Sequence, residues 1–143
     1  MSLTEMKLES NSKIRIDFGG GNLSSDGGLL LMKEFLAKIG FERIAAAKFK
    51  TTDEAKRFHS DADNLLQVMY QIFSSYNEDD CADELSNEPV ITAALEKDRL
   101  ASQPTLSRFF NRMDESTLQQ FSSSSRAQPS FTACNSASAV YAV

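Results

Sequence analysis

The chain has few of the residues that anchor small secreted folds. Its 143 residues include two cysteines, one histidine, three prolines and no tryptophan. Cys81 and Cys134 lie far apart and outside any CxxC or Cys/His pattern, so neither a disulfide framework nor a zinc site is predicted. The N-terminus has no apolar signal core, and no run approaches the roughly 18 apolar residues of a membrane helix. We therefore expect a cytoplasmic protein with no membrane partner.

Positive charge is missing from a long central stretch. From Phe58 to Glu96 there is no lysine or arginine, although acidic residues are frequent there, and the net charge of the chain is −5. This balance excludes a protein that coats nucleic acid by bulk charge, because sequence-independent affinity comes from cations that neutralise phosphates. Any contact with nucleic acid must then be local, so the distribution of charge is more informative than its sum.

Apolar periodicity predicts a mainly α-helical domain with a short N-terminal β segment. KIRIDF alternates as a half-buried strand from Lys13 to Phe18, and a glycine-rich connection leads to a helix that stops at Gly40. Ser60 and Asp63 form a start signal for the strongest helical stripe of the chain. We expect the core to gather around Leu29, Phe35, Leu65, Met69, Phe73, Leu95, Leu106 and Phe109.

Composition divides the chain into three segments. Residues 1–12 are expected to be a flexible N-terminus, and residues 13–121 a helical domain with further short helices over 41–49, within 77–85 and from Pro89. After Phe121 the sequence is rich in Ser and Ala, has no acidic residue and shows no sustained period. We therefore expect residues 122–143 to form a disordered tail.

Three features of the sequence have ordinary structural interpretations. The glycines of DFGGGNLSS lack the GxGxxG spacing and the lysine of phosphate loops, so a flexible connection is predicted. The acidic cluster over 78–84 lacks the spaced ligands of a calcium loop and is typical of a solvated helix start. His59 has no nucleophile or set of metal ligands near it in the sequence, and we expect a surface or capping residue.

A basic cluster begins where the acidic stretch ends. If LASQPTLSRFFNR is helical from Gln103, its apolar residues share one side and Arg108 and Arg112 share the other, where neighbouring cations favour an anionic partner. The preceding helix and turn suit a helix-turn-helix-like pair, whose second helix meets base edges. Alternatively, these cations only solvate an amphipathic helix and balance nearby carboxylates. The residues expected to contact DNA are Lys97, Arg99, Gln103, Thr105, Arg108 and Arg112.

Three segments carry a resemblance to a known family. LSSDGGLLLMKEFL, YNEDDCADELSNEPVITAAL and LASQPTLSRFFNR, in this order, resemble the N-terminal region of bacterial insertion-sequence transposases with a DDE domain of group 1. The resemblance covers Lys13 to Glu115 and departs from the family pattern at Phe110, where a polar residue is commoner. It implies a downstream RNase H-like core, in which three carboxylates bind divalent metal for DNA strand cleavage and joining.

The resemblance also implies what this chain would lack. No strand that could carry the first catalytic carboxylate follows LASQPTLSR, and the tail resembles an out-of-frame or read-through end. We therefore expect a truncated transposase that retains a DNA-contacting region, with no catalytic residue, metal site or cofactor of its own. Divalent metal, Mg²⁺ in particular, is expected only for the full-length family.

The expected partners are DNA, at the ends of the insertion element, and a second copy or a full-length transposase. A helical module that docks on another protein through Phe109, Phe110 and the acidic helices is the alternative from a different class. A transposase remnant without function is the third possibility. Salt dependence separates the first two, because phosphate binding weakens steeply with salt whereas apolar docking does not.

Overall fold

The structure, a computed structural model, describes residues 5–20, 26–51, 53, 55–78 and 80–126. Within these segments it contains two short strands and seven helices, which confirms a mainly α-helical fold with a small N-terminal β segment. None of these helices has the length and apolar character needed to cross a membrane. The helices are α1 (Leu29–Lys38), α2 (Phe41–Lys48), α3 (Asp61–Phe73), α4 (Cys81–Glu84), α5 (Pro89–Leu95), α6 (Gln103–Arg112) and α7 (Glu115–Arg126).

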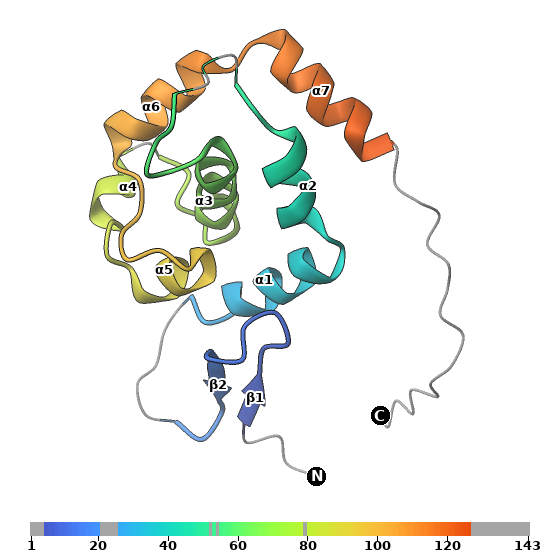
Figure 1. Cartoon of the computed structure of the whole chain (residues 1–143). Coiled ribbons are helices and arrows are strands. Elements are labelled where there is room, and N and C mark those ends of the chain that lie inside the picture. The colour runs from blue at the N-terminus through green and yellow to red at the C-terminus, as the bar shows by residue number, and fades with distance from the viewer. Residues whose placement is uncertain (1–4, 21–25, 52, 54, 79, 127–143) are drawn as a thin grey trace.

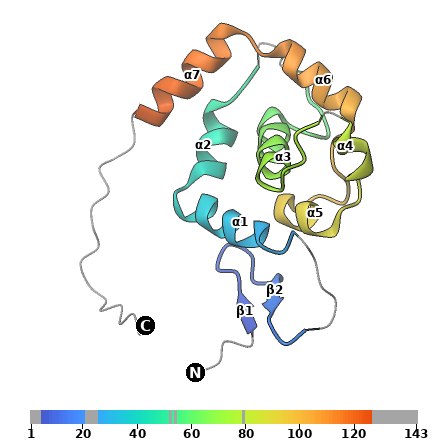
Figure 2. The same ribbon diagram turned by 180° about the vertical axis from the view of Figure 1, so that it is seen from behind.

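Helix α3 lies at the centre, with α1, α2, α4, α5 and α6 arranged around it (Figure 1, Figure 2). It packs against α2, α5 and α6. The predicted start signal is a capping box, in which the Asp63 backbone N–H donates to Ser60 Oγ and the Ser60 N–H donates to the Asp63 carboxylate, at 3.1 and 2.9 Å. Because the box satisfies two backbone donors that a helix end leaves unpaired, it fixes the first turn of α3.

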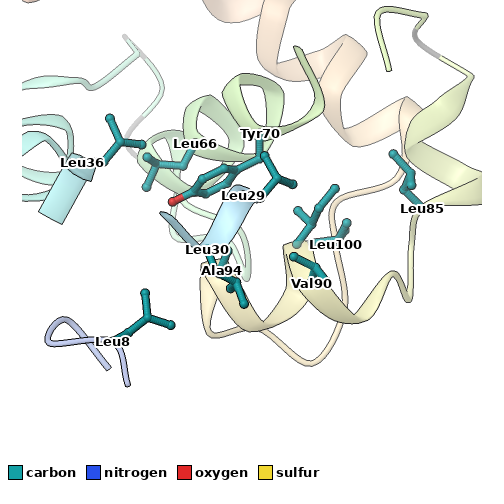
Figure 3. Close-up of a cluster of buried hydrophobic side chains, with 11 residues drawn as sticks. Leu8, Leu29, Leu30, Leu36, Leu66, Tyr70, Leu85, Val90, Ala94 and Leu100 are labelled. Atoms are coloured by element: carbon teal, nitrogen blue, oxygen red, sulfur yellow. The ribbon is translucent and has the colours of Figure 1, made fainter. Parts of the chain in front are cut away.

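The main core surrounds Tyr70, a fully buried residue of α3 (Figure 3). Leucines from α1 and α3 meet the apolar face of α5 there, as Leu29, Leu66 and Val90 illustrate. A second, smaller cluster joins α4 to α6 through Ala82, Ala101 and Leu106. The other members of the main core are Leu8, Leu30, Leu36, Leu85, Ile91, Ala94 and Leu100.

The predicted core list is only partly right. Leu29, Leu106 and Phe109 are buried, and Leu65, Met69 and Leu95 are half-buried. Phe35 and Phe73 were expected inside but are 56% and 43% exposed. Helix α3 instead buries three amides, those of Asn64, Gln67 and Gln71.

Hydrogen bonding explains why α3 buries Gln67. The Gln67 side chain donates from Nε2 to the carbonyl oxygen of Ala101, and the Ala101 N–H donates to Gln67 Oε1, at 2.8 and 2.7 Å. Both bonds are buried. Burying Gln67 thus leaves neither polar group of Ala101 unpaired, and an unpaired buried polar group costs about 1–3 kcal/mol.

Helix α1 is oriented by a buried lysine. Lys33 is 3% exposed, and its Nζ donates to the carbonyl oxygen of Ala94 at 2.6 Å. The same ammonium lies 3.5 Å from Glu42 and 3.6 Å from Glu96. Turning Lys33 inward brings Phe35, two positions later, to the outside, which is why the prediction for Phe35 was wrong.

Residues 5–8, part of the segment predicted to be flexible, lie in a two-stranded sheet and in the main core. Strand β1 (Glu5–Lys7) pairs antiparallel with β2 (Arg15–Asp17), with Met6 opposite Ile16. Leu8 follows β1 and is buried in the main core (Figure 3). Leu8 thus anchors part of the segment expected to be flexible, because burying a leucine side chain contributes about 1.5–3 kcal/mol to stability.

Helix α7 begins at a cap and extends into the predicted tail. Asp114 Oδ1 accepts hydrogen bonds from the backbone N–H and the hydroxyl of Thr117, both at 2.8 Å. The helix continues to Arg126, so residues 122–126 are helical where disorder was expected. It packs against α2. The remaining residues of the predicted tail, 127–143, lie outside the described residues.

The burial pattern of α3 predicts a contrast between two neighbouring apolar residues. Leu66→Ala should lower the free energy of unfolding by about 2–5 kcal/mol, because it leaves a cavity in the core. Phe73→Ala should change it by less than about 1 kcal/mol, because much of the ring already lies in water. Urea denaturation followed by circular dichroism measures both. Equal losses would mean that the orientation of α3 is wrong.

Candidate nucleic-acid interface

Helix α6 presents two different sides. Leu106 and Phe109 face the interior, as predicted, while Pro104, Arg108 and Asn111 are exposed. Phe110, expected on the apolar side, is 40% exposed. The polar side that sequence spacing predicted is therefore largely open to solvent.

The first turn of α6 is closed by a carboxylate. The Gln103 N–H donates to Asp83 Oδ1, on α4, at 2.9 Å, while the Ser102 and Thr105 hydroxyls lie 3.1 Å apart. Free N–H groups at a helix start attract phosphate. Because Asp83 already lies at this position, the start of α6 is less suited to an anion than its middle.

Arg112 is held by an ion pair with α3. Its Nη2 donates to Asp61 Oδ1 at 3.1 Å, and the two side chains are only 16% and 13% exposed. Asp61 Oδ2 accepts two further hydrogen bonds from Thr51, from the backbone N–H at 2.9 Å and the hydroxyl at 2.8 Å. Arg112 thus ties the end of α6 to the start of α3 and to the segment before it.

Lys97 is held in the same way. Its ammonium lies 2.9 Å from Asp63 Oδ2 and 5.5 Å from the centre of the Phe58 ring. The preceding helix α5 ends at Leu95, and Glu96 adopts a left-handed backbone with φ 55°. Lys97 therefore fixes the connection 96–102 between α5 and α6.

The six predicted residues thus fall into three groups. Arg99 and Arg108 are exposed and form no ion pair with any residue that the structure describes. Lys97 and Arg112 are each paired with an aspartate of α3. The remaining two, Gln103 and Thr105, are half-exposed at the start of α6.

Hydrogen bonding lowers the pKa of both aspartates. Burial raises the pKa of Asp61, but the hydrogen bonds from Thr51 and Arg112 outweigh it and hold the pKa below its ordinary value. For Asp63, burial is again opposed, here by Lys97 and by Ser60, and the pKa is lowered. Both carboxylates are therefore ionised at neutral pH and stabilise the fold in that form.

The helix-turn-helix-like arrangement stays a prediction. Two helices, α5 and α6, do flank a seven-residue connection, residues 96–102. Helix α6 packs against α3 and α4, and Gln67 of α3 binds the connection at Ala101. The support for α6 thus comes mainly from α3 and α4.

A second basic segment was missed from the sequence. A cavity of about 750 Å³ is lined by residues of α2, the segment 49–62 and α7, among them Lys50, Lys56, Arg57 and His59. Arg57 is paired with Asp53. The signal in the sequence was KFKTTDEAKRFH, which carries four cations and one histidine just before the cation-free stretch.

Comparison with known proteins identifies the class as transposases. Residues 6–137 match the family described as transposase DDE domain group 1, and the chain belongs to this family. The match begins before and ends after the segment 13–115 that carries the resemblance. Neither the curated proteins nor the solved structures contain a match.

The family implies a divalent metal held by carboxylates, and the described residues do not fit one. No three His, Cys, Asp or Glu side chains come together within residues 5–20, 26–51, 53, 55–78 and 80–126 in a way that could hold a metal ion. Asp61 and Asp63, the least exposed acids near the interface, already have cationic partners. No metal-dependent step is assigned to these residues.

The two arginines of α6 should differ in their effect on stability. Arg112→Ala should lower the free energy of unfolding by about 1–3 kcal/mol, because it leaves Asp61 without its charged partner. Arg108→Ala, an exposed residue, should change it by less than about 0.5 kcal/mol. Urea denaturation of Arg108→Ala, Arg112→Ala, Asp61→Asn and Asp61→Asn/Arg112→Ala tests this, and a coupling energy near zero between Asp61 and Arg112 would contradict the ion pair.

Acid should remove the contribution of Asp61. Its pKa is lowered on folding, so this contribution is fully present above the ordinary value of about 3.9 and is lost as pH falls through the lowered pKa. The difference in urea midpoint between the natural chain and Asp61→Asn should therefore be largest near pH 7 and shrink below about pH 4. Asp98→Asn, at an exposed position, is the control. A difference independent of pH would contradict the assignment.

Proposed function

We propose that this member of the transposase family contacts DNA through the exposed side of α6 and the connection before it. The observation that carries the proposal is the exposure of Arg99 and Arg108, which have no ion pair within the described segments, beside two cations that α3 neutralises. Lys97 and Arg112 then position the interface, and the other two carry its charge. Of the four cations expected from the sequence to contact DNA, this proposal keeps Arg99 and Arg108 as contacts and makes Lys97 and Arg112 positioning residues.

The side chains beside Arg108 suit a contact with base edges. Thr105 and Asn111 lie three residues before and after it, on the same side of α6. Arginine pairs with guanine through two hydrogen bonds, and asparagine pairs with adenine in the same way. Gln103 can also pair with adenine, and Arg99, in the connection, suits a phosphate.

We propose binding, and not strand cleavage, for the described region. The carboxylates that cleave DNA in this family would come from outside it, and for a truncated transposase, as the sequence predicts, from a full-length partner. The ends of the insertion element are the DNA that such an assembly handles, in the cytoplasm. A second copy of this chain is the other candidate partner.

Docking on another protein is the competing proposal, and burial weakens it. The docking surface expected from the sequence consists of Phe109, Phe110 and the acidic helices, but Phe109 is fully buried and only Phe110 of the two rings is partly exposed. On α6 this leaves one half-exposed ring, and single exposed apolar side chains are normal. The exposed cations therefore favour DNA over a protein partner.

Removing the charge of Arg108 should weaken DNA binding without affecting the fold. Titrations of element-end duplex at low salt, read by fluorescence anisotropy, should give weaker binding for Arg108→Ala. When they are repeated at increasing salt, the slope of log affinity against log salt concentration should be smaller in magnitude by about one. If Arg108 reads a base, the loss should be about 1–3 kcal/mol on element-end DNA and smaller on unrelated duplex.

Arg43→Ala is the matched control, because it removes an equal charge from an exposed position of α2. It should leave DNA affinity unchanged. Equal affinities of the natural chain, Arg43→Ala and Arg108→Ala, or no binding by any of them, would exclude α6 as the interface. Binding that does not weaken with salt would favour the protein-docking alternative.

A further inference from the structure

Phe58 is an aromatic ring held in solvent. It is 70% exposed, more than any other large apolar residue that the structure describes. His59 meets it nearly at a right angle, with ring centres 4.8 Å apart, and the Lys97 ammonium lies over the ring. Because Asp63 fixes Lys97, the ring has a defined position although most of its surface faces water.

The cavity next to this ring carries unpaired positive charge. Arg57 and His59 both line it, and the centre of the His59 ring lies 4.8 Å from that of Phe58, so Phe58 lies next to the cavity although it is not one of its lining residues. Its two acidic residues, Asp53 and Asp61, already have arginine partners. Lys50 and Lys56 are exposed and form no ion pair with the described parts of the chain, and they leave the cavity with an excess of positive charge.

We propose that Phe58 and this cavity bind an unpaired nucleotide of a nucleic-acid strand. The base stacks on the open surface of the Phe58 ring, and the phosphates lie against Lys50 and Lys56. Exposed aromatic rings beside a basic groove are how proteins hold single strands, because every base has a face that can stack. The volume of about 750 Å³ is sufficient for a ligand of this size.

The chemistry of the cavity favours a nucleotide over an apolar peptide. Its lining combines Phe49 and three alanines with Lys50, Lys56 and Arg57. An apolar peptide would leave the lysines without a partner, whereas a nucleotide supplies both a flat base and charged phosphates. Duplex DNA hides its base faces, so Phe58 can stack only on a base that has left the helix. The inference rests on the proposed function in taking nucleic acid as the ligand, but it uses none of the exposed residues of α6.

Single-stranded oligonucleotides test the site directly. With the full chain and labelled oligothymidylate, Phe58→Ala should weaken binding about tenfold, while its thermal melt and its affinity for duplex stay unchanged. Phe35→Ala removes an exposed ring from α1 and should bind as the natural chain does. Lys50→Ala/Lys56→Ala should weaken binding and reduce its salt dependence. Equal binding by Phe58→Ala and Phe35→Ala would overturn the proposal.

A tryptophan at this position gives a second readout. The chain contains no tryptophan, so Phe58→Trp introduces a single emitter whose fluorescence should be quenched when a base stacks on it. This variant should retain binding, because a larger ring still stacks. Binding without a change in the emission of Phe58→Trp would overturn the stacked geometry.

Two further measurements distinguish this site from the α6 interface and show whether its ligand is DNA or RNA. Arg108→Ala should weaken duplex binding and leave oligothymidylate binding unchanged, so either site can fail alone. Phe58-dependent binding of oligothymidylate or oligouridylate supports the inference, and the tighter of the two identifies DNA or RNA as the ligand. Binding of neither strand would overturn the inference, whatever the duplex result.

Discussion

Two buried hydrogen bonds between the Gln67 side chain and the backbone of Ala101 determine where the basic segment meets the rest of the protein. The amide group of Gln67 pairs with both polar groups of Ala101, so neither backbone group is left unpaired inside the protein. On either side of this point, Asp63 holds Lys97 and Asp61 holds Arg112. Helix α3 therefore acts as the support of α6, and its polar first half is what positions the exposed side of that helix.

The acidic and basic segments, separate in the sequence, form ion pairs with each other at this contact. The acidic run and the basic cluster are neighbours in the fold, where two carboxylates of α3 neutralise two of the later cations. The chain has a net charge of −5, yet Arg99 and Arg108 are exposed and have no ion pair within the residues that the structure describes. A locally positive surface on an acidic protein selects for partners that reach that surface, because bulk attraction to polyanions is absent.

Sequence periodicity predicted the elements better than their orientation. The capping box at Ser60, the helix from Gln103 and the stop near Gly40 depend on residues close in the chain, and all three are present. The inward faces of α1 and α3 depend on Lys33 and Gln67, whose partners lie 61 and 34 residues away, and no local pattern contains this information. The same limit applies to the interface, since spacing groups the cations but does not reveal which of them have carboxylate partners.

The buried ammonium of Lys33 also bears on the order of assembly. Its acceptors come from α2 and from the end of α5, so α1 can bury this charge only when both of those helices are in place. Docking of α1 is therefore conditional on both helices, so α1 opens whenever either of them does. The protection of backbone amides in α1 against hydrogen exchange then cannot exceed that in α2 or in α5, two helices that are far apart in the sequence.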